Sequence, residues 1–269
     1  MLITEGRDVL RHDFHTHSLQ SPCGIHSVLE LLNIAAQKGT ETINVSDHGN
    51  ASGRTMNFGV LANPKRTPMK ARISIGSQYK DIRLLAGVEG NIFDDGTSDL
   101  DFIKETCYNQ FALISAGFHS SAKKIRQLRS ESANFKALTK FISQHSIDIL
   151  THPCTEAFPL PINDLIRLAQ EYQFALEVNN TYLVVKEMNN RALQQMIEEA
   201  LANNVTLLCN SDGHTWYELF ECGAVRNLIE KTMNLVMEDV VPLNFGNWES
   251  VLNRFKRLRV RSAHITCPQ

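Results

Sequence analysis

Short polar fragments containing histidine or an acidic residue follow one apolar run after another along this chain. The first of them, His15-Thr16-His17, ends an apolar run and places two imidazoles two residues apart. Residues two apart in a strand point to the same face of a sheet, so these imidazoles could bind one metal ion together. Taken alone, such a pair is more often two half-buried histidines on an edge strand. The recurrence of similar fragments at later run ends favours a metal site.

Segments with strand-like and helix-like patterns alternate over nearly the whole chain. Residues 27–39 have apolar positions at helical spacing, with Ser27 and Glu30 as a capping box and Gly39 as a stop signal. Pro161 stands where a further helix can begin. The predicted helices are 27–39, 131–145, 162–172 and 188–204, and the predicted strands include 41–49, 82–91, 110–120, 146–153, 174–180 and 205–214.

This alternation predicts an α/β fold, and we expect a (β/α) barrel rather than a doubly wound sheet. In a barrel the C-terminal ends of all strands converge on one mouth, whereas an open sheet spreads them along an edge. The length of 269 residues suits a single barrel. We expect one domain over residues 1–269, with residues 232–269 as a C-terminal helical extension packed on it.

Composition and charge exclude several classes of partner. The formal net charge is −2 and aromatic residues make up 7% of the chain, so nothing favours a nucleic-acid partner. No apolar stretch has the length of a signal peptide or a transmembrane helix. Six cysteines are present without a C-x-x-C pair, which is typical of reduced thiols. We therefore expect a cytoplasmic protein without a membrane partner, and the oligomeric state stays open.

Six run-end fragments are similar, in order, to those of one known family. They are His15-Thr16-His17, Ser46-Asp47-His48, Gly87-Val88-Glu89, Gly117-Phe118-His119, Thr151-His152-Pro153 and Ser211-Asp212-Gly213-His214. Together they resemble the PHP (polymerase and histidinol phosphatase) family over residues 13 to about 215. Residues 87–92, 176–182 and 210–215 look most like its branch of small, stand-alone trinuclear-zinc phosphatases. The resemblance implies a distorted (β/α)7 barrel with the metal site at the C-terminal mouth of the strands.

Two of the ion positions that the resemblance implies share a carboxylate. Glu89 would bridge them, and Asp212 would complete the first. The imidazole ligands would be His15 and His17 in the first position, and His119 and His152 in the second.

The third ion position would be held by His48 and His214, and here the chain departs from the family. The remaining ligand, usually His or Asp, aligns with Cys23. A thiolate is a good zinc ligand, so the position could survive as a softer site biased toward zinc. Alternatively, Cys23 is only a small loop residue, and His26 or water completes the ligand set.

This set of ligands suits the hydrolysis of phosphate esters by two or three divalent metal ions. Zinc is the favoured ion, with manganese or iron as alternatives. Paired metals lower the pKa of a bound water and neutralise phosphoryl oxygens, so a metal-bridging hydroxide would attack the phosphorus. The residues expected to take part in catalysis are Glu89, Asp212, His48 and His214. Either of the last two, if free of metal, could protonate the leaving oxygen.

Substrate-binding residues are harder to identify than metal ligands. Arg54 is one candidate for binding phosphate, and Lys123, Lys124 and Arg126 are others, although most basic loop residues are merely solvated. Asn179 and Asn180 end a strand, so they could bind substrate hydroxyls or cap a turn. Beside the ligands, Asp13 and Asp47 could orient imidazole N–H groups, and Asp47 could equally cap a turn.

The leading hypothesis is a phosphatase acting on a small phosphorylated metabolite. The alternative is a phosphodiesterase or exonuclease on single-stranded nucleic acid or dinucleotides, which would need a basic groove with stacking aromatics. Two further readings are a non-enzymatic metal-binding module and a different metallohydrolase chemistry such as deamination. Retention of nearly every ligand position and the Gly-Val-Glu and Ser-Asp-Gly-His fragments count against these two.

Overall fold

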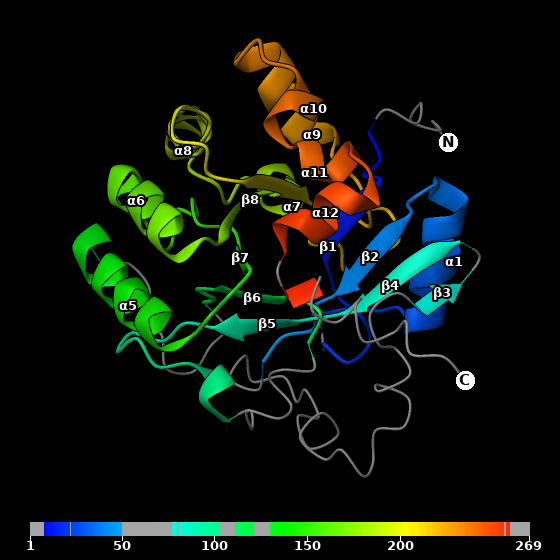
Figure 1. Ribbon diagram of the computed structural model, residues 1–269, viewed down its shortest axis with the longest axis horizontal. Coiled ribbons are helices and arrows are strands. Elements are labelled where there is room, and N and C mark those ends of the chain that lie inside the picture. The colour runs from blue at the N-terminus through cyan, green and yellow to red at the C-terminus, as the bar shows by residue number, and fades with distance from the viewer. Residues whose placement is uncertain are drawn as a thin grey trace.

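The computed structural model describes residues 8–21, 23–49, 77–79, 81–102, 111–120, 130–255 and 257–258. The chain forms two sheets of mainly parallel strands covered by helices, so the predicted α/β class is confirmed (Figure 1). The first sheet has the order β1-β2-β4-β3, in which β3 alone is antiparallel. Its strands are β1 (His12–Thr16), β2 (Thr42–Val45), β3 (Ser77–Tyr79) and β4 (Ile82–Ala86).

The second sheet is parallel throughout, in the order β5-β6-β7-β8-β9. The apolar run 82–91, predicted as one strand, forms two, because at Gly87 the chain leaves its pairing with β2 and pairs with β6 instead. A side chain at Gly87 would collide with Asn44, since an added Cβ would lie 2.5 Å from its Nδ2. The strands are β5 (Val88–Asn91), β6 (Ile114–Gly117), β7 (Ile149–Leu150), β8 (Ala175–Asn179) and β9 (Leu207–Asn210).

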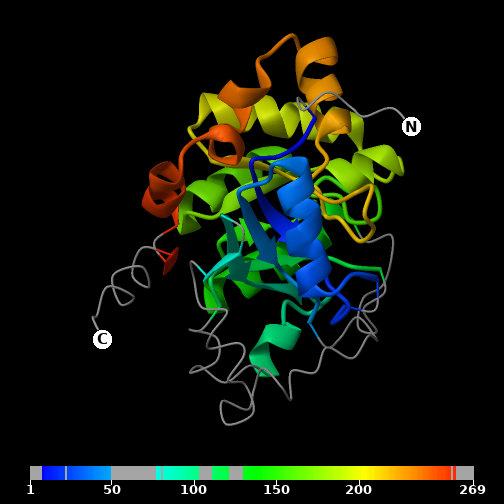
Figure 2. The same cartoon turned by 90° about the vertical axis from the view of Figure 1, so that its right-hand side faces the viewer.

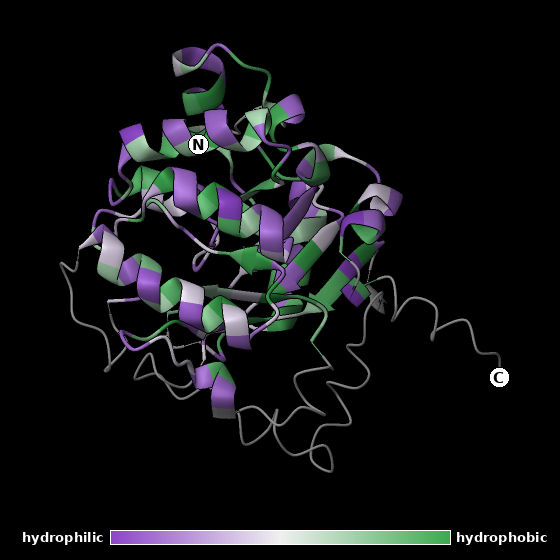
Figure 3. Cartoon of the chain, turned by 60° about the vertical axis from the view of Figure 1, so that its left-hand side comes forward, coloured by the Kyte–Doolittle hydropathy of each residue, from purple (hydrophilic) through white to green (hydrophobic). Residues whose placement is uncertain are grey.

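Four long helices follow strands, as predicted. α1 (Val28–Lys38) begins with the predicted capping box, in which Ser27 Oγ accepts from Glu30 N, and it ends at Gly39 with φ of 83°. α1 lies against β2 and β4, in front of the sheet in Figure 2. The other three lie side by side, with hydrophobic and hydrophilic residues alternating along them (Figure 3). They are α5 (Glu131–Gln144), α6 (Ile162–Tyr172) and α8 (Asn190–Ala202).

Shorter helical elements fill the connections and the C-terminal part. Asn244, in the element Pro242–Phe245, ties the C-terminal part to the strands, because its Nδ2 donates to His12 O and its Oδ1 accepts from Cys209 N. The division at residue 232 stays a prediction. Among the described helices, none is long and apolar enough to cross a membrane. The elements are η3 (Asp99–Phe102), α7 (Asn180–Val184), α9 (Gly223–Arg226), η4 (Asn227–Thr232), α10 (Met237–Val240), α11 (Pro242–Phe245) and α12 (Trp248–Arg254).

One buried cluster takes apolar side chains from strands of both sheets and is covered by α11 and α12. Burying these side chains together is the main favourable term that holds the sheets against each other. The strand residues in this cluster are Phe14, Leu85, Ile149, Ala175 and Leu208.

The carboxyl ends of strands from the two sheets lie beside each other. An isolated parallel bridge joins Thr16, at the end of β1, to Gly213 beyond β9, and another joins His48 to Glu89 of β5. Asp212 N also donates to His15 O at 3.0 Å. These contacts bring the run-end fragments of both sheets to one place.

Candidate metal centre

Four donor atoms from His15, His17, Glu89 and Asp212 form a compact group. His15 Nε2 lies 3.1 Å from His17 Nε2, 3.3 Å from Glu89 Oε2 and 3.4 Å from Asp212 Oδ1. His17 Nε2 lies 3.0 Å from Asp212 Oδ1 and 3.6 Å from Glu89 Oε2. Adjacent ligand atoms of a tetrahedral zinc ion are about 3.3 Å apart, because zinc–ligand bonds measure about 2.0–2.1 Å. These distances suit a single ion.

A second group uses the other oxygen of the same glutamate. Glu89 Oε1, His119 Nε2 and His152 Nε2 form a triangle in which every side measures 3.2 Å. The three side chains are buried. Three such corners of a tetrahedron leave one position open, as catalytic zinc sites do. Glu89 therefore offers one oxygen to each of two neighbouring groups.

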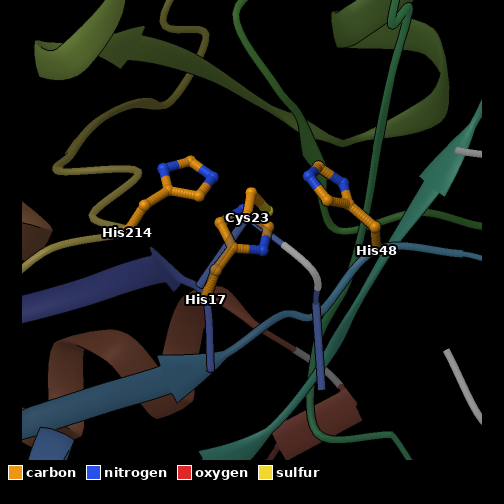
Figure 4. A group of neighbouring side chains, drawn as sticks. All are labelled: His17, Cys23, His48 and His214. Carbon is orange, nitrogen blue, oxygen red and sulfur yellow. The ribbon is translucent and has the colours of Figure 1, made fainter. Parts of the chain in front are cut away.

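The third group combines a thiol with imidazoles. The donor atoms of Cys23, His48, His214 and His17 all lie within 4.8 Å of one another (Figure 4). Glu218 holds the loop after β9, because its Oε2 accepts from both His214 N and Thr215 N. His26, the alternative considered for this position, is not part of any such group among the described residues.

The polar atoms of these groups fit divalent cations better than they fit each other. Two imidazole nitrogens that face each other at 3.1–3.2 Å cannot both be donors, and both lone pairs can serve one cation. Within the described residues, His119 Nδ1 is buried without a hydrogen-bond partner. Glu89 Oε2 and His48 Nδ1 are also buried, and they lie 2.8 Å apart as an ion pair. Imidazole, carboxylate and thiol donors suit zinc, and the nitrogen and oxygen donors also suit manganese or iron.

Electrostatics keep the carboxylates ionised despite burial. Burial alone would raise the pKa of Glu89, but the neighbouring His15, His119 and His48 hold it well below its usual range. Burial opposes protonation of His48, yet the charge of Glu89 raises its pKa to about 10. Burial lowers the pKa of His119 to about 4 against the pull of Glu89. A proton on His48 thus offsets the negative charge, and a cation bound there must displace it.

Glu177 of β8 was not identified from the sequence. It supports this centre through hydrogen bonds to two of the ligand residues. Its Oε1 accepts from His15 Nδ1 at 2.8 Å and from Asn210 Nδ2 at 2.8 Å. Its Oε2 accepts from His152 N at 2.8 Å and from Asn179 Nδ2 at 3.0 Å. A single acidic residue within an apolar strand is easily interpreted as a side chain that faces solvent. The available signal was its spacing, because Glu177 lies two residues before Asn179 and shares its face of the strand.

The two aspartates expected to orient imidazoles accept hydrogen bonds from backbone and hydroxyl groups next to the ligands. Asp13 Oδ1 accepts from the backbone N of His15, and Asp13 Oδ2 accepts from Ser211 Oγ. Asp47 accepts from both Ser18 N and Ser18 Oγ. These two aspartates therefore fix the backbone of the loops that carry the ligands.

The predicted substrate-binding residues lie in different surroundings. Asn180 Oδ1 accepts from Ala224 N at 3.0 Å and from Val225 N at 3.3 Å at the first turn of α9, and substrate binding by Asn180 stays a prediction. Asn179 faces the centre and donates to Asp212 Oδ2 at 3.1 Å. The basic candidates lie outside the described residues: Arg54, Lys123, Lys124 and Arg126.

Comparisons with known proteins give a consistent class of enzyme. No protein-family model matches the chain. A protein of Shewanella sp. (strain ANA-3) named probable phosphatase is 28% identical over 219 residues, which cover 81% of this chain and 82% of the relative. Another probable phosphatase, from Acetivibrio thermocellus, is 25% identical over 250 residues, covering 93% and 97% respectively.

A solved structure has a similar fold. Histidinol phosphate phosphatase from Lactococcus lactis subsp. lactis Il1403, in complex with zinc, L-histidinol and phosphate, matches with a TM-score of 0.56. The match covers 82% of this chain and 92% of that chain at 16% identity, so it concerns the fold. Together with the relatives in sequence, it supports the prediction that this chain is an enzyme of the phosphatase class.

Proposed function

We propose that this chain is a metal-dependent phosphomonoesterase of the PHP type that acts on a small phosphorylated metabolite in the cytoplasm. The observation that carries the proposal is the position of Glu89, whose two oxygens belong to two adjacent groups of ligand atoms. A shared carboxylate holds two cations at the short separation that suits phosphate-ester hydrolysis. The sequence relatives named probable phosphatase support the same reaction.

We infer that the two sheets form one distorted (β/α)7 barrel with this centre at its C-terminal mouth. β4 and β5 are separated by Gly87 alone and count as one bent strand, so β1, β2, β4–β5, β6, β7, β8 and β9 make seven. The bridge between Thr16 and Gly213 supports closure between β9 and β1. The apolar cluster shared by both sheets suits the filled interior of such a barrel.

The proposed ligands would form three ion positions, and the first two share Glu89. His15, His17, Glu89 and Asp212 would hold one ion, and Glu89, His119 and His152 the second. Bound divalent ions supply an activated water and neutralise the phosphoryl oxygens. We favour zinc, with manganese or iron as alternatives.

The third position would be formed by His48, His214 and Cys23, next to the first two. The side chain of His214 is 21% exposed, which places this imidazole where a substrate can reach it. When it holds no cation, it can donate a proton to the leaving oxygen. Arg54 stays our candidate for binding the phosphate from the loop beyond His48.

The test compares metal-stripped with metal-reloaded protein on a panel of phosphomonoesters that includes p-nitrophenyl phosphate. We expect hydrolysis only after reloading with zinc, manganese or iron. Turnover that survives chelation, or none on the whole panel with two or more ions bound per chain, would refute the proposal. Hydrolysis of single-stranded DNA or dinucleotides, with the monoesters untouched, would establish the exonuclease alternative in its place.

A further inference from the structure

Cys23 contributes a sulfur atom to a centre whose other groups contain only nitrogen and oxygen donors. Its Sγ belongs to the same group of donors as Nδ1 or Nε2 atoms of His17, His48 and His214 (Figure 4). Two further sets of donors within 4.8 Å of one another overlap with it, namely His15, His17 and Asp212, and His48, Glu89 and His119. The three groups touch each other through His17 and His48, so the sulfur lies at one side of a continuous cluster.

The loop that carries Cys23 is held in place by backbone contacts to the site. Ser21 N donates to Ser18 O at 2.9 Å, and Gly24 N donates to Ser21 O at 2.9 Å. Ile25 N donates to the carbonyl oxygen of His214 at 3.3 Å. Gly24 permits this path, because an added Cβ would lie 2.3 Å from Ser18 O. The thiol therefore stays beside the imidazoles without any need for the loop to close.

Sulfur changes which cation this position prefers. Thiolates select soft or borderline ions such as zinc and cadmium, whereas carboxylates and imidazoles also accept manganese. Of the described cysteines, Cys154, Cys209 and Cys222 are buried and take no part in these groups, and Cys23 is partly exposed.

We propose that Cys23 binds as a thiolate and makes the third position a zinc-selective site within a mixed-metal centre. One zinc ion would stay with Cys23, His48 and His214 while the positions around Glu89 exchange zinc for manganese. This inference rests on the metal-dependent function proposed above. It assigns to one position a preference that the other two do not share.

The first experiment is a cobalt(II) titration of the metal-stripped full-length chain, followed by absorbance. A cysteine ligand gives a sulfur-to-cobalt charge-transfer band in the near ultraviolet, which imidazole and carboxylate ligands do not give. We expect this band in the wild type, its loss in Cys23→Ser, and its retention in the matched control Cys222→Ser. Absence of the band in the wild type, or its persistence in Cys23→Ser, would overturn the proposal.

The second experiment measures metal content after equilibration with zinc in a large excess of manganese. Wild type should retain one zinc per chain with manganese in the other positions. In Cys23→Asp the zinc preference of this position should fall by at least about tenfold, because the carboxylate that replaces the thiolate also suits manganese. Equal zinc-to-manganese ratios in the two proteins would refute the selectivity.

Both readouts are independent of turnover. A cobalt–thiolate band in a protein that hydrolyses no phosphoester would leave this inference standing and defeat the proposed function. Full phosphatase activity without the band would leave the proposed function standing and defeat this inference.

Discussion

The proposed ligands of this centre divide into a strand-borne part around Glu89 and a loop-borne part with Cys23 and His214. The two parts are built in different ways. Around Glu89, ligand atoms on or just beyond strand ends lie 3.0–3.6 Å apart and are buried. Cys23 and His214 lie on loops, and both residues are partly exposed. The strand ends thus place ligand atoms at separations that suit a bound ion.

The hydrogen bonds behind the two parts differ in the same way. Glu177 accepts four hydrogen bonds, and two of them come from His15 Nδ1 and His152 N. On the loop side, Glu218 accepts from the backbone at His214 and Thr215 but from neither side chain. A hydrogen bond to the imidazole fixes the orientation and the tautomer of the ring, whereas a hydrogen bond to the backbone fixes only the path of the loop. We therefore expect substitutions at the strand ends to have larger effects.

The largest effect is expected for Glu89→Gln, which removes the charge shared by the two strand-borne groups. We expect kcat/KM to fall by at least about a thousandfold, the upper range for losing one electrostatic contribution to a transition state. Metal analysis should show the loss of both ions around this residue, with the ion at Cys23 retained. A variant that keeps all its metal and most of its activity would show that the two groups do not depend on this carboxylate.

The next effect is expected for Glu177→Gln, because Glu177 is fully buried and contacts the proposed ligands His15 and His152. Losing such a supporting carboxylate weakens metal affinity by about 10–100-fold. Added metal should therefore restore much of the lost turnover, which a chelator titration can measure. Glu198→Gln, on the exposed face of α8, is the matched control and should behave as wild type. Loss of activity that excess metal does not rescue would argue for a direct catalytic role of Glu177.

A smaller effect is expected for His214→Asn in the loop-borne group. One ion fewer should bind per chain, while the ions around Glu89 stay, so kcat/KM should fall by less than in Glu89→Gln and Glu177→Gln. Elemental analysis together with steady-state kinetics checks both expectations. Should the variant lose every ion, the two parts of the centre would be one cooperative unit and the contrast between them would fail.

What the sequence predicted follows from local chemistry. The capping box of Ser27 with Glu30 and the stop at Gly39 depend on residues close in sequence, and the structure confirms them. The nine expected ligands were named from the resemblance of local fragments to those of the PHP family, and most of these fragments end an apolar run. By contrast, the change of pairing from β2 to β6 at Gly87 and the burial of Glu177 depend on which strands become neighbours. Those pairings involve residues far apart in sequence, which no local pattern contains.

The smallest effect is expected for Asn180→Ala, and it separates two roles for a residue next to the centre. Asn180 is buried, and its Oδ1 accepts from Ala224 N and Val225 N at the start of α9. Removing a side chain that accepts from the first turn of a helix costs about 0.5–2 kcal/mol of stability. Chemical denaturation should show this loss, while KM for the best phosphomonoester stays unchanged. Asn190→Ala, an exposed position in α8, is the control that should change neither quantity. A raised KM with unchanged stability would mean that Asn180 binds substrate after all, and that the loop ends near the centre recognise substrate as well as support the fold.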